Sequence, residues 1–169
     1  LKNIPTTADA LPALREASVK ELFASTGVLS PVELESRFEV YAEQYVLSIE
    51  VEAKLVIDMA KTMIYPAAMR YLSDLGMTAA SMVDMGVELD GTIAKTVADA
   101  VNAMMSAVAE LAEAVEKHDF DSTEEHMQFC ANVIRGLMDE VRLHADALEA
   151  EVADELWPLP KYQEMLFIR

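Results

Sequence analysis

The sequence contains little glycine and proline, with 5 and 6 residues respectively among 169. An all-β fold needs many tight turns, and these two residues are among the commonest turn formers. Hydrophobic residues make up 53% of the chain, and many of them are alanine, the strongest helix former. The composition therefore favours an all-α protein, and the length suits one domain with its own core.

Basic residues are also scarce, because 13 Lys and Arg stand against 30 Asp and Glu, for a formal net charge of -17. Nucleic-acid binding requires a cationic surface, and so does attraction to an anionic membrane. The charge balance argues against both kinds of partner. A well-solvated acidic exterior accounts for it, and an acidic face that meets a basic partner is the alternative.

The chain has one cysteine, Cys130, which cannot form an intramolecular disulfide. Its apolar neighbours favour a small buried side chain over a nucleophile. One thiol fits a reducing cytoplasm, and the chain shows no signal-peptide pattern and no apolar run long enough for a membrane span. We therefore predict a cytoplasmic protein. Because the sequence begins at Leu1 without an initiator methionine, we expect a fragment of a longer protein.

The clearest helix start lies at Ser30, Pro31 and Glu33, which occupy the cap, the first position and the third position of a capping box. Downstream, apolar residues recur every three or four positions and predict one buried stripe: Leu34, Phe38, Tyr41, Tyr45, Ile49, Ala53, Val56, Ala60 and Met63. The pattern predicts a very long helix over about residues 31–72, roughly 60 Å in length. We expect a kink near Pro66 and a stop near Gly76.

Shorter helices are expected on either side of this long helix. One runs from Thr6 or Thr7 to a stop at Gly27, with a possible break near Ser18. Residues 73–91 are expected to form a connector, with a short helix around 78–85 as an alternative within it, followed by a helix that ends near residue 118.

A last helix begins at Asp121 or Ser122 and ends before Trp157, which two prolines follow closely. The tail, residues 157–169, is too apolar for a free end and is predicted to dock in a non-helical or short-helical form. Together these elements predict a single domain over residues 1–169, folded as an antiparallel helical bundle.

A search for catalytic motifs finds none in the sequence. A ferritin-like dimetal site needs Glu-x-x-His pairs, and none precedes His118, His126 or His144. Phosphate-binding loops, Cys-x-x-Cys pairs and nucleophile elbows are also missing. The acidic segment 118–126 is an alternative metal loop, but a helix end followed by a cap and an acidic first turn explains it better. We therefore predict no catalytic, cofactor-binding or metal-binding residue.

Two further features suggest binding rather than catalysis. Eleven methionines are unusual, and several lie on or beside the apolar stripes, where they form either an adaptable groove for a partner helix or ordinary core. Core is the commoner outcome. Arg37, on the long helix, either clamps an anionic group or forms an ordinary surface salt bridge, and the salt bridge is the default interpretation.

Several segments resemble the C-terminal region of type III glutamine synthetases. They are residues 4–14, 34–45, 49–53, 57–61, 65–67 and 156–167, whereas residues 73–121 carry little that is distinctive. The resemblance implies a cytoplasmic parent enzyme that makes glutamine from glutamate, ammonia and ATP with Mg or Mn. It also implies a large oligomer of stacked rings. The ligands of the family's metals, ATP and glutamate lie upstream and are not in this sequence.

The leading hypothesis is therefore a non-catalytic C-terminal domain with a structural, assembly or regulatory role. Its partners would be the catalytic domain of the parent and the sister subunits. A stand-alone helical binding module with a Met-rich groove is the alternative. The residues expected to make interface or docking contacts lie on the long helix and in the tail: Arg37, Tyr41, Tyr45, Trp157, Leu159, Tyr162, Leu166 and Phe167.

Overall fold

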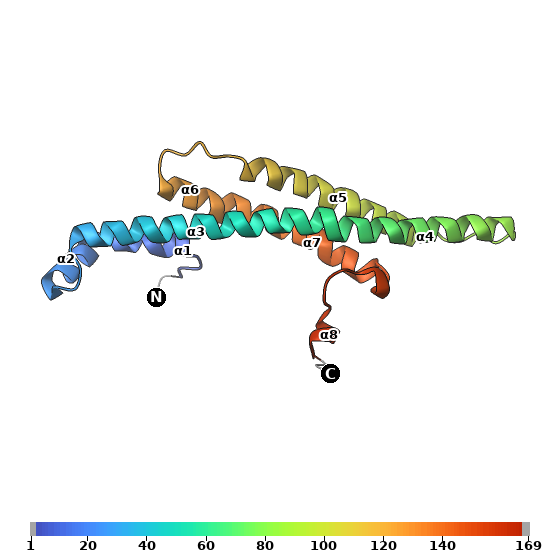
Figure 1. Cartoon of the computed structure of the whole chain (residues 1–169), viewed down its shortest axis with the longest axis horizontal. Helices are drawn as coiled ribbons and strands as arrows, with labels where there is room; N and C mark the ends of the chain where they lie inside the picture. The colour runs from blue at the N-terminus through green and yellow to red at the C-terminus, as the bar shows by residue number, and fades with distance from the viewer. Residues whose placement is uncertain (1–2, 167–169) are drawn as a thin grey trace. The chain divides into compact units, whose positions relative to one another are not determined.

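The computed structural model describes residues 3–166 (Figure 1), apart from the side chains of Tyr162 and Gln163. Helices account for most of this part of the chain, and it contains no strand, so the all-α prediction is confirmed. None of the helices within residues 3–166 has the length and apolar character needed to cross a bilayer.

The chain divides into two compact units, and each is built from two separate stretches of sequence. The first unit comprises Leu1–Lys54 and Leu111–Met138, and the second comprises Leu55–Glu110 and Asp139–Arg169. Helices α3 (Pro31–Met59), α5 (Thr92–Val115) and α7 (Arg135–Glu151) contribute residues to both units.

The first unit begins with a helical segment in three pieces, where the sequence pattern indicated one short helix. These are α1 (Thr7–Ala10), the 3-10 turn η1 (Leu11–Arg15) and α2 (Ala17–Thr26). The break lies at Glu16, whose backbone is extended, two residues before the expected position. Gly27 then ends α2 in the left-handed conformation, at φ 67°, as its position after the last helical residue indicated.

Helix α3 starts at the predicted capping box. The Glu33 N–H donates to Ser30 Oγ at 3.3 Å, and the Ser30 N–H donates to the Glu33 carboxylate at 2.7 Å. This carboxylate accepts from both donors of Ser30, which lowers the pKa of Glu33. The core of the first unit packs the apolar face of α3 against α6 (Thr123–Phe129) and the π-helical turn η3 (Cys130–Ile134). Its buried members include Leu34, Phe38, Ala42, Val46, Ile49, Leu111, Val115, Met127, Cys130 and Ile134.

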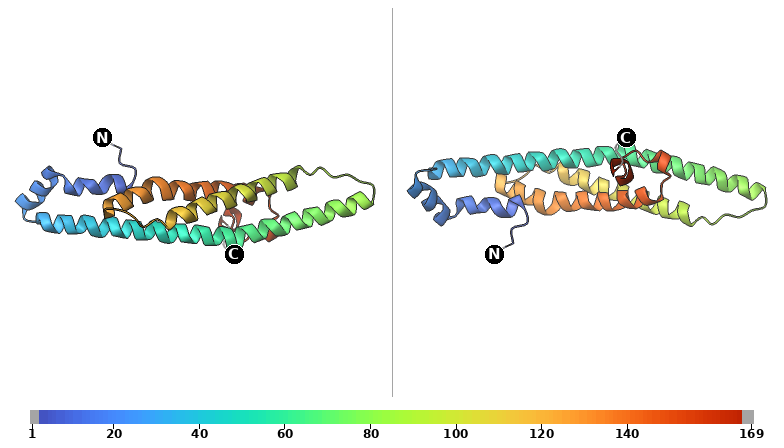
Figure 2. Two further views of the ribbon diagram at one scale, coloured as in Figure 1. Left: turned by 90° about the horizontal axis from the view of Figure 1, so that it is seen from above. Right: turned by 90° about the horizontal axis from the view of Figure 1, so that it is seen from below.

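The second unit contains the π-helical turn η2 (Ala60–Ile64), α4 (Tyr65–Asp84), most of α5 and α7, the 3-10 turn η4 (Asp154–Leu156) and α8 (Tyr162–Leu166). Residues 85–91 connect α4 to α5, which runs in the opposite direction (Figure 2). This arrangement matches the expected antiparallel bundle. The buried side chains include Ile64, Ala67, Ala68, Val97, Val101, Met104, Val108, Val141, Leu148 and Val152.

The long helix extends further than the sequence pattern indicated. Helical structure is continuous from α3 through η2 to the end of α4 at Asp84, so the expected stop near Gly76 is wrong. Of the connector expected at 73–91, only residues 85–91 lie outside the helices. In the turn before Pro66, the Tyr65 N–H donates to the Ala60 carbonyl, five residues back. This wider π turn stands where an α turn would press the proline ring against the preceding carbonyl, so the helix accommodates Pro66 without ending.

The chain leaves α7 at Glu151, and the start of the tail docks within the second unit. Trp157 is buried, Leu159 is half-buried, and η4 contacts α4. The ammonium of Lys161 lies 2.7 Å from the Asp154 carboxylate and closes the turn. Further along, Leu166 is 73% exposed, so docking involves the first residues of the tail. Phe167 lies outside the described residues.

Candidate functional site

A cluster of charges joins three segments of the first unit around Arg15, the last residue of η1. Its guanidinium donates to Glu35 (2.7 Å) and Glu39 (2.5 Å) on α3, and to Glu124 (2.7 Å) on α6. The same group lies 3.5 Å above the centre of the Phe38 ring, which adds a cation–π contact. We call these residues the Arg15 cluster.

The Arg15 cluster raises the pKa of Arg15 and lowers the pKa of Glu35. Burial of the Arg15 guanidinium lowers its pKa, but the hydrogen bond to Glu35 and the charges of the carboxylates outweigh this, and the pKa is raised. The hydrogen bond from Arg15 in turn lowers the pKa of Glu35. The sequence pattern pointed to Arg37 and not to Arg15, but Arg37 is exposed and forms no ion pair with any residue described.

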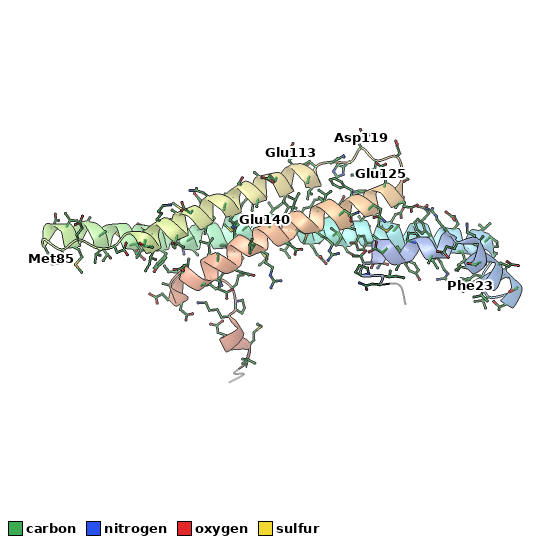
Figure 3. The ribbon with its side chains drawn as sticks, turned by 180° about the vertical axis from the view of Figure 1, so that it is seen from behind. Phe23, Met85, Glu113, Asp119, Glu125 and Glu140 are labelled. Carbon is green, nitrogen blue, oxygen red and sulfur yellow. The ribbon has the colours of Figure 1, made fainter. Side chains whose placement is uncertain are left out.

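The first unit also contains a cavity of about 440 Å³ between α3 and the start of α6, which we call the α3–α6 cavity. Two residues labelled in Figure 3 help to find this part of the first unit: Asp119, in the loop before α6, and Glu125, in the first turn of α6. Ser122 caps α6 by accepting from the Glu125 N–H, as the sequence indicated, and the Glu125 carboxylate accepts from the Asp121 N–H. The lining residues are Glu43, Val46, Leu47, Glu50, His118, Phe120, Ser122, Thr123 and His126.

One wall of the α3–α6 cavity is an ordered polar and aromatic arrangement. His126 Nε2 lies 3.2 Å from Glu50 Oε1, within hydrogen-bond distance. The Phe120 ring stacks on the His126 imidazole, with ring centres 4.2 Å apart and planes 14° from parallel. The Phe120 ring also contacts the Phe129 ring. The Lys117 ammonium lies about 5 Å from the centres of both phenyl rings.

The lone thiol lies behind this wall. Cys130 is buried, and burial together with the nearby Glu50 charge raises its pKa to about 11. The thiol is therefore protonated at neutral pH and unsuited to act as a nucleophile, in agreement with the prediction from its apolar neighbours.

A smaller cavity of about 360 Å³ lies in the second unit, beside His144 and Glu140 on α7. His144 Nε2 is 3.3 Å from Glu140 Oε1, one turn away on the same helix (Glu140 is labelled in Figure 3). Among residues 3–166, no three His, Cys, Asp or Glu side chains are grouped as they would be to hold a metal ion.

The residues expected at an interface occupy different environments. Arg37 and Tyr41 are exposed on α3, whereas Tyr45 is half-buried and its hydroxyl is buried without a partner among the described atoms. Trp157 is buried too, and its indole N–H likewise has no partner in that part of the chain. The side chain of Tyr162 lies outside what the structure describes.

A second apolar row runs along α3, which the sequence analysis also missed. Val40, Leu47 and Val51 are 55%, 62% and 65% exposed. At 100° per residue these positions fall within about 40° of one another, on the side of the helix opposite the buried Phe38 and Ile49. We call them the outer row of α3. The prediction of one buried stripe on the long helix did not include this row, because a helix in a globular protein usually has only one apolar face.

The methionines of the groove suggested as an alternative lie in different environments. Met104 and Met127 are fully buried in the two cores, as ordinary packing requires. Met63 and Met69 are partly exposed on the second unit. These side chains therefore divide between core and surface.

Comparison with known proteins connects this helical chain to one enzyme family. Residues 1–83 match the family model described as the glutamine synthetase C-terminal domain. The chain is 31% identical over 179 aligned residues to a type-3 glutamine synthetase of Dictyostelium discoideum, an alignment that covers 100% of this chain and 24% of that protein.

Residues 1–83 of the chain belong to the glutamine synthetase C-terminal domain family. A glutamine synthetase of Bacteroides fragilis is 27% identical over 100% of this chain and 24% of its own length. One of Butyrivibrio fibrisolvens is 25% identical over 99% of this chain and 25% of its own length. The chain thus spans about a quarter of the length of these curated relatives, and the resemblance noted in the sequence is confirmed.

Proposed function

We propose that this chain is a non-catalytic helical domain that attaches to the catalytic part of a type III glutamine synthetase and supports its assembly. The outer row of α3 carries the proposal. Three large apolar side chains on the solvent side of a helix that already has a core face are more than scattered surface hydrophobes. A helix with two apolar faces fits a position between its own core and a second protein surface.

The parent enzyme would ligate ammonia to glutamate at the expense of ATP, with Mg or Mn. The relatives support this activity, since a type-3 glutamine synthetase and two other glutamine synthetases match over nearly the whole chain. The groups that bind ATP and metal would then belong to the remaining three-quarters of the parent. Within residues 3–166, neither cavity offers the clustered ligands that such chemistry needs.

The partners in this proposal are the catalytic domain of the same polypeptide and sister subunits of a cytoplasmic oligomer. The outer row would contact one of these surfaces. Arg37 and Tyr41, both exposed on the same helix, would lie at the edge of such a contact. Polar and aromatic residues of this kind commonly surround an apolar interface centre.

The test uses the full-length parent enzyme with Val40→Ser and Val51→Ser combined, because the third residue of the outer row, Leu47, also lines the α3–α6 cavity. Because both side chains are exposed in this chain, the substitutions should leave its own fold intact. Each removes an apolar side chain worth about 1–3 kcal/mol when buried at an interface, so subunit association should weaken at least tenfold. Light scattering across a concentration series measures the assembly, and glutamine formation measures the activity.

Val28→Ser is the matched control, because Val28 is 64% exposed but lies in the turn before α3, away from the outer row. It should leave the assembly of the parent unchanged. An assembly as stable in the double variant as in the wild type, with unchanged attachment of the helical domain in limited proteolysis, would contradict the proposal.

A further inference from the structure

The α3 wall of the α3–α6 cavity has a regular chemical order, and one of its residues, Leu47, also belongs to the outer row. Glu43, Val46, Leu47 and Glu50 stand at positions i, i+3, i+4 and i+7, so they share one face over two helical turns. The backbone positions of Glu43 and Glu50 are roughly 10 Å apart along the helix axis, at 1.5 Å per residue, and the apolar pair lies between them.

The charges around this wall favour a cation. No lysine or arginine is among the residues that line the cavity. Glu43 forms no hydrogen bond or ion pair with any described residue, and its side chain is exposed. Glu50 is only 16% exposed and engages His126 through one oxygen, which leaves the other oxygen available. An anionic ligand would be repelled by the carboxylates of both Glu43 and Glu50.

The middle of the cavity favours an apolar chain. Val46 and Leu47 line its α3 side, and Phe120 lines it from the loop before α6. The stacking of Phe120 on His126 fixes that ring in place before any ligand arrives. A volume of about 440 Å³ lies in the range of small-molecule sites.

We propose that the α3–α6 cavity binds a short linear aliphatic diamine. One ammonium group would be held by Glu43, the other by Glu50, and the methylene chain would cover Val46, Leu47 and the Phe120 ring. A chain of four or five methylenes, with a charge-assisted hydrogen bond of roughly 2.8 Å at each end, matches the axial rise of roughly 10 Å from Glu43 to Glu50. A monoamine reaches only one of them. This assignment does not rest on the role of the chain in a glutamine synthetase.

The test is calorimetric titration of the 169-residue chain with 1,4-diaminobutane at pH 7.5 and 0.15 M salt, where non-specific attraction to the acidic surface is screened. We expect saturable binding of one diamine per chain. 1-Aminobutane, which lacks the second charge, and 1,4-butanediol, which lacks both, should bind at least tenfold more weakly.

Glu43→Gln and Glu52→Gln form the decisive pair of variants. Both replace one exposed carboxylate of α3, but Glu52 does not line the cavity. Glu43→Gln should weaken diamine binding at least tenfold, whereas Glu52→Gln should match the wild type, and thermal unfolding confirms that both variants are folded. The proposal is overturned if the wild type shows no saturable binding, if both variants lose affinity equally, or if 1-aminobutane binds as tightly as the diamine.

Discussion

Arg15 shows how much one side chain contributes to the first unit. Its guanidinium connects the first helical segment to α3 and α6, which are far away in the sequence. Three carboxylates around one cation would repel each other without it, because the chain already carries a formal charge of -17. The planar fork of arginine suits such a position better than the point charge of lysine.

Replacing Arg15 with methionine should therefore destabilise the chain at neutral pH. We expect a loss of about 1–2 kcal/mol in the free energy of unfolding, toward the low end because the paired carboxylates are about 40% exposed to solvent. Urea unfolding at pH 7, followed by circular dichroism, measures it. Arg142→Met is the control, since Arg142 is 79% exposed and pairs only with Asp146 one turn away. Its effect should stay within about 0.5 kcal/mol.

The difference between wild type and Arg15→Met should depend on pH in a defined direction. Arg15 lowers the pKa of Glu35 below the usual value of 4.5, so the ion pair stabilises the fold fully above that value. As the pH falls through the lowered pKa of the folded state, Glu35 becomes protonated and the wild type loses this advantage. The free energies of unfolding of the wild type and of Arg15→Met should therefore converge below pH 4. A gap that stays constant from pH 7 to pH 3 would show that Arg15 acts by packing alone.

The sequence alone did not single out Arg15, and the reason is physical. Its partners, Glu35 and Glu124, lie 20 and 109 positions away, and no local spacing links them. Arg37 attracted attention because it lies within a distinctive segment, yet it remains exposed. Long-range ion pairs depend on the tertiary arrangement, which helix periodicity does not contain.

At the scale of elements, local rules predicted the helix boundaries that local chemistry determines. Ser30 and Ser122 cap their helices through side-chain hydrogen bonds, and Gly27 ends α2. The rules failed at Pro66 and Gly76, where both residues lie inside a continuous helical segment. A lone helix would end there, but burial of Ile64, Ala67 and Ala68 stabilises the segment around the proline.

Gly76 and Gly27 should respond in opposite ways to substitution by alanine. A Cβ at either position would meet nothing within 4 Å, so backbone conformation decides the outcome. Gly76 lies in α4, where alanine should add about 0.5–1 kcal/mol to the free energy of unfolding. Gly27 has φ 67°, so Gly27→Ala should cost about 1 kcal/mol. Chemical unfolding of both variants measures the two shifts, and shifts of the same sign would disprove the explanation.

At the scale of the whole molecule, the family was evident from the sequence, whereas its surfaces were not. The closing segment around Trp157 was expected to dock, and Trp157 is indeed buried, but Leu166 is exposed. The outer row of α3 and the α3–α6 cavity were both missed. The outer row has helical spacing, but one core stripe already accounted for the helix. The cavity forms between segments about 70 positions apart, so it leaves no local pattern.

The tail should contribute to the stability of the second unit mainly through Trp157. Trp157→Ala should lower the free energy of unfolding by about 3 kcal/mol, the lower end for a buried tryptophan because its indole N–H forms no hydrogen bond with the described residues. Leu166→Ala should change it by less than about 0.5 kcal/mol, since Leu166 is exposed. Urea unfolding of the two variants makes the comparison. Equal effects would mean that the whole tail docks as one piece.

The π-helical turn η2 has a consequence for how this family tolerates insertions and deletions. A π turn holds one more residue than an α turn, so a helix can lose that residue there and keep the same sides facing inward before and after it. The same deletion two turns later, in the regular part of α4, would rotate every following side chain by about 100°. Alignment gaps among relatives should therefore gather at residues 60–64. Beyond them, equivalent residues in two relatives should be those that lie on the same side of the helix, even where their sequence numbers differ.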